Sequence, residues 1–111
     1  MTSEGGADIA IAMGATSYEI DSYVIDTLLT DLAGHDRKAS AYLVYLVILT
    51  AAGDGKTAMS HAQLAERTGL SRRSVQAAVA WLRRRQLVEV FRSSPTDTSV
   101  YRPLTPWRRP T

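Results

Sequence analysis

Residues 72–84 carry long hydrogen-bonding side chains at intervals suited to contact with the edges of nucleic-acid bases. A guanidinium can form two parallel hydrogen bonds with guanine, and a glutamine amide can do the same with adenine. On a helix, a rotation of about 100° per residue gathers these groups and two alanines on one side. That side holds Arg73, Gln76, Ala77, Ala80 and Arg84, flanked by Arg72 and Arg83. The short alanines would let the backbone approach a base pair closely.

The other side of the same predicted helix is aliphatic. Val75, Ala78, Val79 and Leu82 recur at i, i+3, i+4 and i+7, which indicates a stripe that faces a protein core. An arginine-rich side opposite such a stripe suits insertion into the major groove of DNA. The same pattern also occurs where arginines are simply solvated, and the spacing alone leaves both interpretations open.

The elements that position this helix are a preceding helix and a tight turn. Ser60 and Gln63 have the spacing of a capping box, which predicts a helix that starts at residue 61. Gly69 falls where the chain must turn, and a positive φ is cheap there only for glycine. Ser71 is a good N-cap for the second helix. The side chains expected to pack between the two helices are Leu64, Ala65 and Leu70.

Two short strands are predicted after the helices. Residues 87–91 alternate in polarity and carry β-branched side chains, and residues 99–102 form a second strand that Pro103 stops. The Pro and Asp between them are typical of a turn. This hairpin would direct Arg92 and Arg102 towards a neighbouring phosphate or the minor groove. The alternative is a plain two-stranded cap on the core.

With these elements in place, residues from about 22 to 102 resemble the winged helix-turn-helix superfamily of prokaryotic DNA-binding proteins. Nearly all of the likeness lies in residues 64–90, LAERTGLSRRSVQAAVAWLRRRQLVEV. These residues are similar to small domains of bacterial transcription regulators and to the N-terminal regions of phage and plasmid replication initiators. The resemblance implies that the base-reading residues are Ser71, Arg72, Arg73, Gln76 and Ala77. Ala77 is the weakest match, since it offers only contact to a thymine methyl group.

The predicted fold class is therefore mainly α with a small β-hairpin, in the winged helix-turn-helix arrangement. The expected function is sequence-specific binding of double-stranded DNA by a small transcription regulator that is not an enzyme and needs no cofactor. The expected phosphate contacts are Arg83, Arg84, Arg92 and Arg102. Two alternatives stay open: a DNA-binding module of a replication origin or plasmid, and a winged helix that binds a protein instead of DNA.

Upstream of this unit the sequence predicts two more helices. Asp21 or Ser22 would cap the first, which runs to about Ala33. After a break, Asp36 would cap a longer helix over residues 37–52. The longer helix is apolar almost all round, so most of its sides must be covered.

A homodimer is one way to cover the sides of helix 37–52 that the domain leaves open. The interface would then be formed by Tyr42, Tyr45, Ile48 and Leu49. The alternative is that this helix is simply the central core helix of a small domain.

Charge is unevenly distributed along the chain. Residues 1–35 hold six acidic and no Lys or Arg side chains, a net charge of −6, whereas residues 36–111 hold all 13 basic and 5 acidic side chains, a net charge of +8. A chain of this kind can turn its basic half to a polyanion such as DNA and keep its acidic half away. The competing explanation is attraction between the two halves, within one chain or across a dimer.

Composition limits the classes of protein to be considered. The 111 residues are 45% hydrophobic, enough for one domain, which we expect over 18–103, between a flexible arm (1–17) and a basic tail (104–111). Either Trp107 pins that tail to the core or the tail is frayed. The chain has no cysteine, which excludes disulfides and cysteine metal sites. No apolar run is long enough to span a bilayer and the N-terminus lacks a basic secretion signal, so a cytoplasmic protein is expected.

Catalytic and metal-binding patterns are weak. Residues 53–57 contain the Gly-Lys-Thr of a phosphate-binding loop, but the further glycine that such a loop needs is replaced by Thr50. We interpret these residues as an interhelical turn. His35 and His61 lack the partner spacing of a metal site, so no metal is expected. The sequence indicates no particular small-molecule effector, which would have to use a pocket between the N-terminal helices or act through a partner.

Overall fold

The structure is a computed structural model that describes residues 17–91 and 98–108. These residues form a mixed α/β fold of helices and one three-stranded antiparallel sheet. The elements in chain order are η1 (Val24–Leu28), η2 (Thr30–His35), α2 (Ala39–Ala52), β1 (Thr57–Ser60), α3 (His61–Thr68), α4 (Arg72–Arg84), β2 (Val88–Phe91) and β3 (Thr98–Pro103). The first two are π-helical and together form one N-terminal helix.

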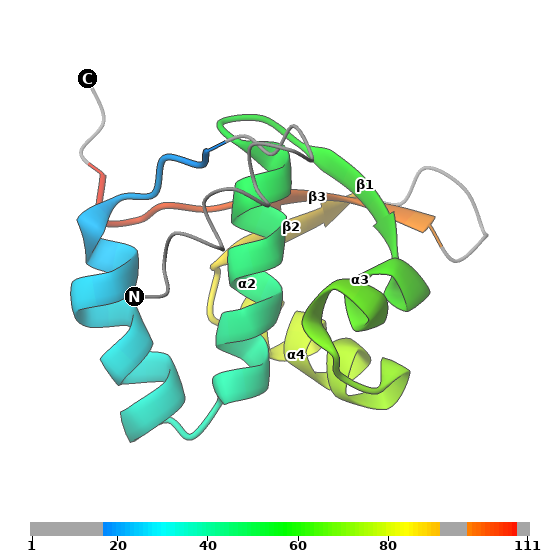
Figure 1. Ribbon diagram of the computed structural model, residues 1–111, viewed down its shortest axis with the longest axis horizontal. Helices are drawn as coiled ribbons and strands as arrows, with labels where there is room; N and C mark the ends of the chain where they lie inside the picture. Colours follow the sequence, from blue (N-terminus) through cyan, green and yellow to red (C-terminus); the bar gives the residue numbers. More distant parts are fainter. Residues whose placement is uncertain (1–16, 92–97, 109–111) are drawn as a thin grey trace, which may run out of the picture.

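Helix α2 is the centre of the core. It lies between the N-terminal helix and the α3–α4 pair, with the sheet packed across it (Figure 1). The Tyr42 hydroxyl donates to the Val24 carbonyl at 3.0 Å, and the Tyr45 hydroxyl donates to the Leu104 carbonyl at 2.9 Å. These two bonds join α2 to the N-terminal helix and to the C-terminal segment.

The prediction of a dimer interface on α2 is wrong for the residues chosen. The exposed fractions of the four side chains are 8% or less within a single chain, because the N-terminal helix, the sheet and the tail already cover them. The residues concerned are Tyr42, Tyr45, Ile48 and Leu49. The alternative interpretation, a central core helix, agrees with their burial.

The predicted start of α2 also needs correction. The helix begins at Ala39 and has no side-chain cap, because its N-cap residue is Lys38, whose ammonium group cannot accept a hydrogen bond. Arg37, just before it, has a positive φ of 53°. The Asp36 carboxylate does not cap α2 but accepts a hydrogen bond from Arg85 at 3.1 Å. Asp21 likewise makes no capping bond to the N-terminal helix, since its carboxylate is engaged by the C-terminal tail.

The sheet has the strand order β1-β3-β2. The predicted hairpin is present as β2 and β3, in the register Glu89↔Arg102 and Val90↔Tyr101. Strand β1 was not expected: it pairs with the other side of β3, so residues 53–56 join a helix to a strand and not two helices. Pro103 is the last residue of β3 and does not stop the strand before it.

Some predictions fall on residues that the structure does not describe. These are most of the arm over 1–17, the turn that holds Arg92, and the end of the tail from residue 109. Among the described helices, none has the length and apolar character needed to cross a membrane.

Candidate nucleic-acid interface

The turn between α3 and α4 is built by local hydrogen bonds that the sequence specifies. The Ser60 hydroxyl accepts a hydrogen bond from the backbone N–H of Gln63 at 3.1 Å. The side-chain oxygen of Gln63 accepts one from the backbone N–H of Ser60 at 2.8 Å, which confirms the capping box. Gly69 ends α3 in the left-handed conformation, with φ of 78°, and its N–H donates to the Ala65 carbonyl at 2.8 Å. The predicted positive φ at this glycine is confirmed.

Both ends of α4 are also closed by specific bonds. The Ser71 hydroxyl accepts from the Ser74 amide at 3.0 Å, which confirms Ser71 as the N-cap. At the other end the N–H of Leu87 donates to the Leu82 carbonyl and the N–H of Gln86 to the Arg83 carbonyl, the pair of bonds that defines a Schellman motif. Gln86 takes the left-handed position, with φ of 58°, where glycine is usual. The α3–turn–α4 unit therefore begins and ends at fixed residues.

The two sides of α4 have the environments that the sequence predicted. Val75, Ala78, Val79 and Leu82 are buried, with Val75 and Leu82 completely inaccessible. The predicted base-contacting residues are all exposed, as are both arginines at the end of the helix: Ser71, Arg72, Arg73, Gln76, Ala77, Arg83 and Arg84. We call the exposed side from residue 72 to residue 84 the α4 surface.

The arginines of the α4 surface lie in two pairs at opposite ends of the helix. Arg83 and Arg84 occupy the last turn, where the negative end of the helix dipole favours cations. Arg72 and Arg73 occupy the first turn, where the same dipole disfavours them. Within the described residues no ion pair engages Arg73, Arg83 or Arg84. Helix stability thus accounts for Arg83 and Arg84 but not for Arg73.

The other two predicted phosphate contacts, Arg92 and Arg102, do not belong to the α4 surface. Arg102 lies on β3 and forms an ion pair with Glu89 on the neighbouring strand, with 46% of the arginine side chain exposed. Arg92 lies outside the described residues. Arg85, which follows α4, is held by Asp36 at 3.1 Å and lies over the Trp81 ring at 5.0 Å. Arg85 therefore has a structural role and extends the α4 surface little.

Charge separation along the chain becomes a separation in space. The N-terminal helix carries Asp26 and Asp31 and lies across α2 from α4 (Figure 1). The two carboxylates are therefore kept away from the α4 surface. Attraction between the acidic and basic parts of the chain, the competing explanation, also occurs: Asp21 of the acidic part pairs with Arg108 of the basic part.

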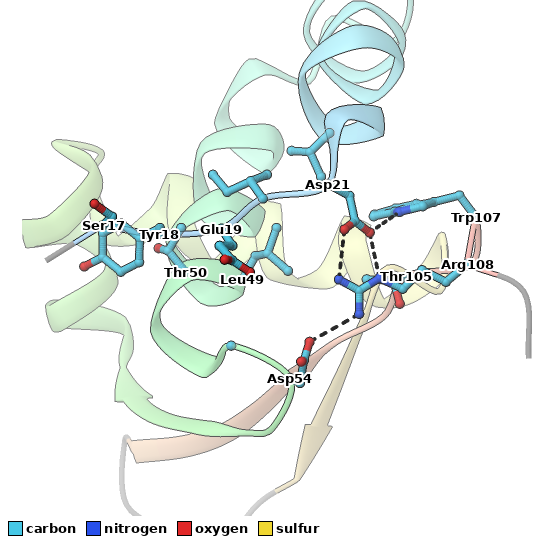
Figure 2. Close-up of a pocket in the computed structure, with 13 residues that line it drawn as sticks. Ser17, Tyr18, Glu19, Asp21, Leu49, Thr50, Asp54, Thr105, Trp107 and Arg108 are labelled. Carbon is cyan, nitrogen blue, oxygen red and sulfur yellow. Dashed lines mark hydrogen bonds and ion pairs between the residues drawn. The ribbon is translucent and has the colours of Figure 1, made fainter. Parts of the chain in front are cut away.

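The structure also contains a polar cluster that the sequence did not predict. The Asp21 carboxylate accepts from the Trp107 indole N–H at 2.8 Å and from Arg108 Nε at 2.6 Å, and Arg108 also reaches Asp54 at 3.2 Å (Figure 2). The Trp107 ring stacks on Tyr23 with centroids 4.8 Å apart. Trp107 therefore pins the tail, and residues 104–108 are not frayed.

The cluster changes the protonation behaviour of its members. The hydrogen bonds from Arg108, and then that from Trp107, lower the pKa of Asp21. The bonds to Asp21 and Asp54 raise the pKa of Arg108. The guanidinium is committed to two carboxylates, so Arg108 is a poor phosphate contact. The only sequence signal for this cluster was the tryptophan in a proline-bounded tail.

Comparisons with protein-family models, with curated proteins and with solved structures find no match for this chain. A functional assignment therefore depends on the geometry and chemistry of its own residues.

Proposed function

We propose that the protein is a winged helix-turn-helix domain that binds double-stranded DNA and acts as a small transcription regulator. In this proposal α4 is the recognition helix and the β2–β3 hairpin is the wing. The observation that carries the proposal is the α4 surface: an exposed arginine and glutamine side on a helix whose opposite side is sealed into the core. Arg73, which opposes the helix dipole, strengthens it, because a phosphate polyanion would offset its cost.

The α4 surface is longer than a major groove is wide. Arg73 and Arg84 are separated by eleven residues, or about 16 Å at a rise of about 1.5 Å per residue. A major groove is about 12 Å wide. The first pair of arginines, with Gln76, can therefore reach base edges while the second pair reaches the phosphates at the groove margin.

The wing contributes less than the helix in this proposal. Arg102 must leave Glu89, or share it, before it can hold a phosphate. An exposed ion pair of this kind is worth about 0–1 kcal/mol, so the exchange is inexpensive. We expect Arg102 to add a contact that is independent of base sequence.

Salt dependence provides the test. On random duplex DNA the first pair of arginines finds no preferred base edges, so we expect all four α4 arginines to neutralise phosphates. Log K should then fall with a slope of about −3.6 against log salt, which is roughly a hundredfold loss between about 50 and 200 mM. The measurement is fluorescence anisotropy of labelled random duplex DNA, followed by selection of bound duplexes from a random pool. The variant R83Q/R84Q should reduce the slope by about two.

A matched control is Lys56→Gln, which removes one exposed cation that precedes β1 and lies outside the α4 surface, with its ammonium over the Phe91 ring at 4.4 Å. This change should leave the slope within about 0.3 of the wild-type value. Absence of DNA binding even at 50 mM salt, in a folded protein, would end the proposal.

A second candidate function, binding to another protein or to a second copy of the chain, has its own observation. Ile25 and Leu29 on the N-terminal helix are 51% and 40% exposed, although both are large and apolar. They lie across α2 from the α4 surface, so a protein contact there leaves DNA binding unobstructed (Figure 1). Sedimentation of the wild type and of I25S/L29S at several concentrations tests whether the partner is a second copy of the chain. In that case the wild type, but not the variant, should show a mass above that of the monomer.

A further inference from the structure

A cavity of about 770 Å³ opens between three segments that are distant in the sequence. Its walls come from residues 17–21, from the end of α2 and the turn after it, and from the tail over 105–108 (Figure 2). Its volume lies in the range of about 300–1,000 Å³ that is usual for small-molecule sites. The cavity is on the N-terminal side of the fold and shares no lining residue with the α4 surface.

The cavity combines an apolar floor with aromatic rings. Val24 and Leu49 line it with exposed fractions of 0% and 8%, which places aliphatic side chains at its base. Tyr18 and Trp107 add two rings, one 58% exposed at the rim and one fixed against Tyr23. Most of the lining residues are polar, so these few apolar and aromatic surfaces suit a ligand that combines a small apolar body with a polar group.

The charges that line the cavity select the sign of the ligand. Glu19, Asp21 and Asp54 are acidic and Arg108 is the only base among the lining residues, which leaves a formal charge of −2. Arg108 binds both Asp21 and Asp54 and so closes that end of the cavity. Glu19 has no ion pair within the described residues. An anion would meet this negative field, whereas a cation would find an uncompensated carboxylate.

We propose that this cavity binds a small organic cation, an amine whose ammonium group pairs with Glu19 and whose apolar body lies on Leu49 and Trp107. The hydroxyls of Ser17 and Thr50 lie on the Glu19 side of the cavity and offer acceptors for the remaining ammonium hydrogens (Figure 2). The site is independent of the DNA-binding proposal, since none of its groups belongs to α3 or α4. The turn after α2 lines the cavity and leads into β1, which leads directly into α3. A bound ligand would therefore be separated from the candidate interface by one strand.

The test uses three probes of nearly equal size and different charge: phenethylamine, 2-phenylethanol and phenylacetate. The variant Trp81→Phe leaves Trp107, which lines the cavity, as the single tryptophan. The fluorescence of Trp107 then reports ligand binding to the cavity, and the experiment needs no DNA. The amine should bind five- to tenfold more tightly than the alcohol, and the acid should bind most weakly, because one partly exposed charge pair is worth about 1 kcal/mol. Amide chemical shifts of residues 17–20 and 53–54 provide a second measurement in the wild-type protein.

Two carboxylate variants complete the experiment. In the Trp81→Phe background, Glu19→Gln should bring the affinity of the amine down to that of the alcohol. Glu66→Gln, which removes an exposed carboxylate on α3, should leave it unchanged. Urea denaturation verifies that both variants stay folded. Equal affinity for amine and alcohol, insensitivity to Glu19→Gln, or absence of both fluorescence and shift changes with phenethylamine would each overturn the proposal.

Discussion

The position of arginines at the two ends of α4 makes a paired prediction for Arg73→Gln and Arg84→Gln. The two side chains lie eleven residues apart, which is about 20° of rotation, so they share one exposed side of the helix. Arg and Gln have nearly equal helix propensity, so propensity cancels in both variants. What differs is the end of the helix dipole that each cation faces.

Removal of the Arg73 charge from the first turn should raise the free energy of unfolding by about 0.3–1 kcal/mol. Removal of the Arg84 charge from the last turn should lower it by a similar amount, so the two variants should differ by about 0.6–2 kcal/mol. Both variants should nevertheless bind DNA more weakly. Arg73→Gln should cost about 1–3 kcal/mol on a selected sequence and relax its base preference, whereas Arg84→Gln should weaken binding to all sequences alike.

The assays are urea denaturation followed by circular dichroism, and anisotropy titrations with a selected and a scrambled duplex. A gain in stability together with a loss of DNA affinity at Arg73 is the signature of a residue kept for function at the expense of the fold. The reasoning is refuted if Arg73→Gln destabilises the protein as much as Arg84→Gln does. It is also refuted if affinity for the selected duplex changes by less than twofold.

Three further predictions concern the turn, the helix end and the tail. Gly69→Ala places a side chain at φ of 78° with no atom within 4 Å of the new Cβ, so only backbone strain should appear, a loss of about 1–2 kcal/mol in urea denaturation. Gln86→Gly should give the reverse, a gain of about 0.5–1 kcal/mol, since it relieves left-handed strain but adds glycine entropy; a loss of stability would contradict the Schellman assignment. Because the pKa of Asp21 is lowered from 3.8 in the fold, its bonds to Trp107 and Arg108 stabilise the tail fully above pH 3.8 and are lost as the pH falls through the folded value. Trp107 fluorescence in the Trp81→Phe background should show release of the tail in that acid range, while Asp21→Asn should show it at neutral pH as well; an identical acid response in both proteins would contradict the assignment.

The sequence by itself determined the parts of the fold whose partners lie within about four residues. The capping box at Ser60, the left-handed Gly69 and the N-cap at Ser71 each depend on one or two backbone bonds nearby, so local residue types suffice to specify them. The buried stripe of α4 follows from the period of the helix, and its exposed side follows as the complement. The local sequence of residues 60–84 therefore specifies almost all of the candidate DNA interface.

Tertiary structure alone decided the contacts between distant residues. Strand β1 is only four residues long and exists because β3 offers it an edge, so no local pattern marks it. Asp36 and Asp21 have the residue type of a cap, but Arg85 and Arg108, which are 49 and 87 residues away, engage their carboxylates instead. A charged partner brought close by folding outcompetes a local amide because an ion pair adds Coulomb attraction to the hydrogen bond.

The apolar helix α2 shows the boundary between the two kinds of information. Its sequence requires that nearly every side be covered, and six of its residues are buried, although Leu43 remains 40% exposed. Whether a second chain or the same chain does the covering depends on how the N-terminal helix, the sheet and the tail close around Tyr45 and Ile48. Burial is a property of the assembled shape, so only the tertiary structure could assign these residues to the core.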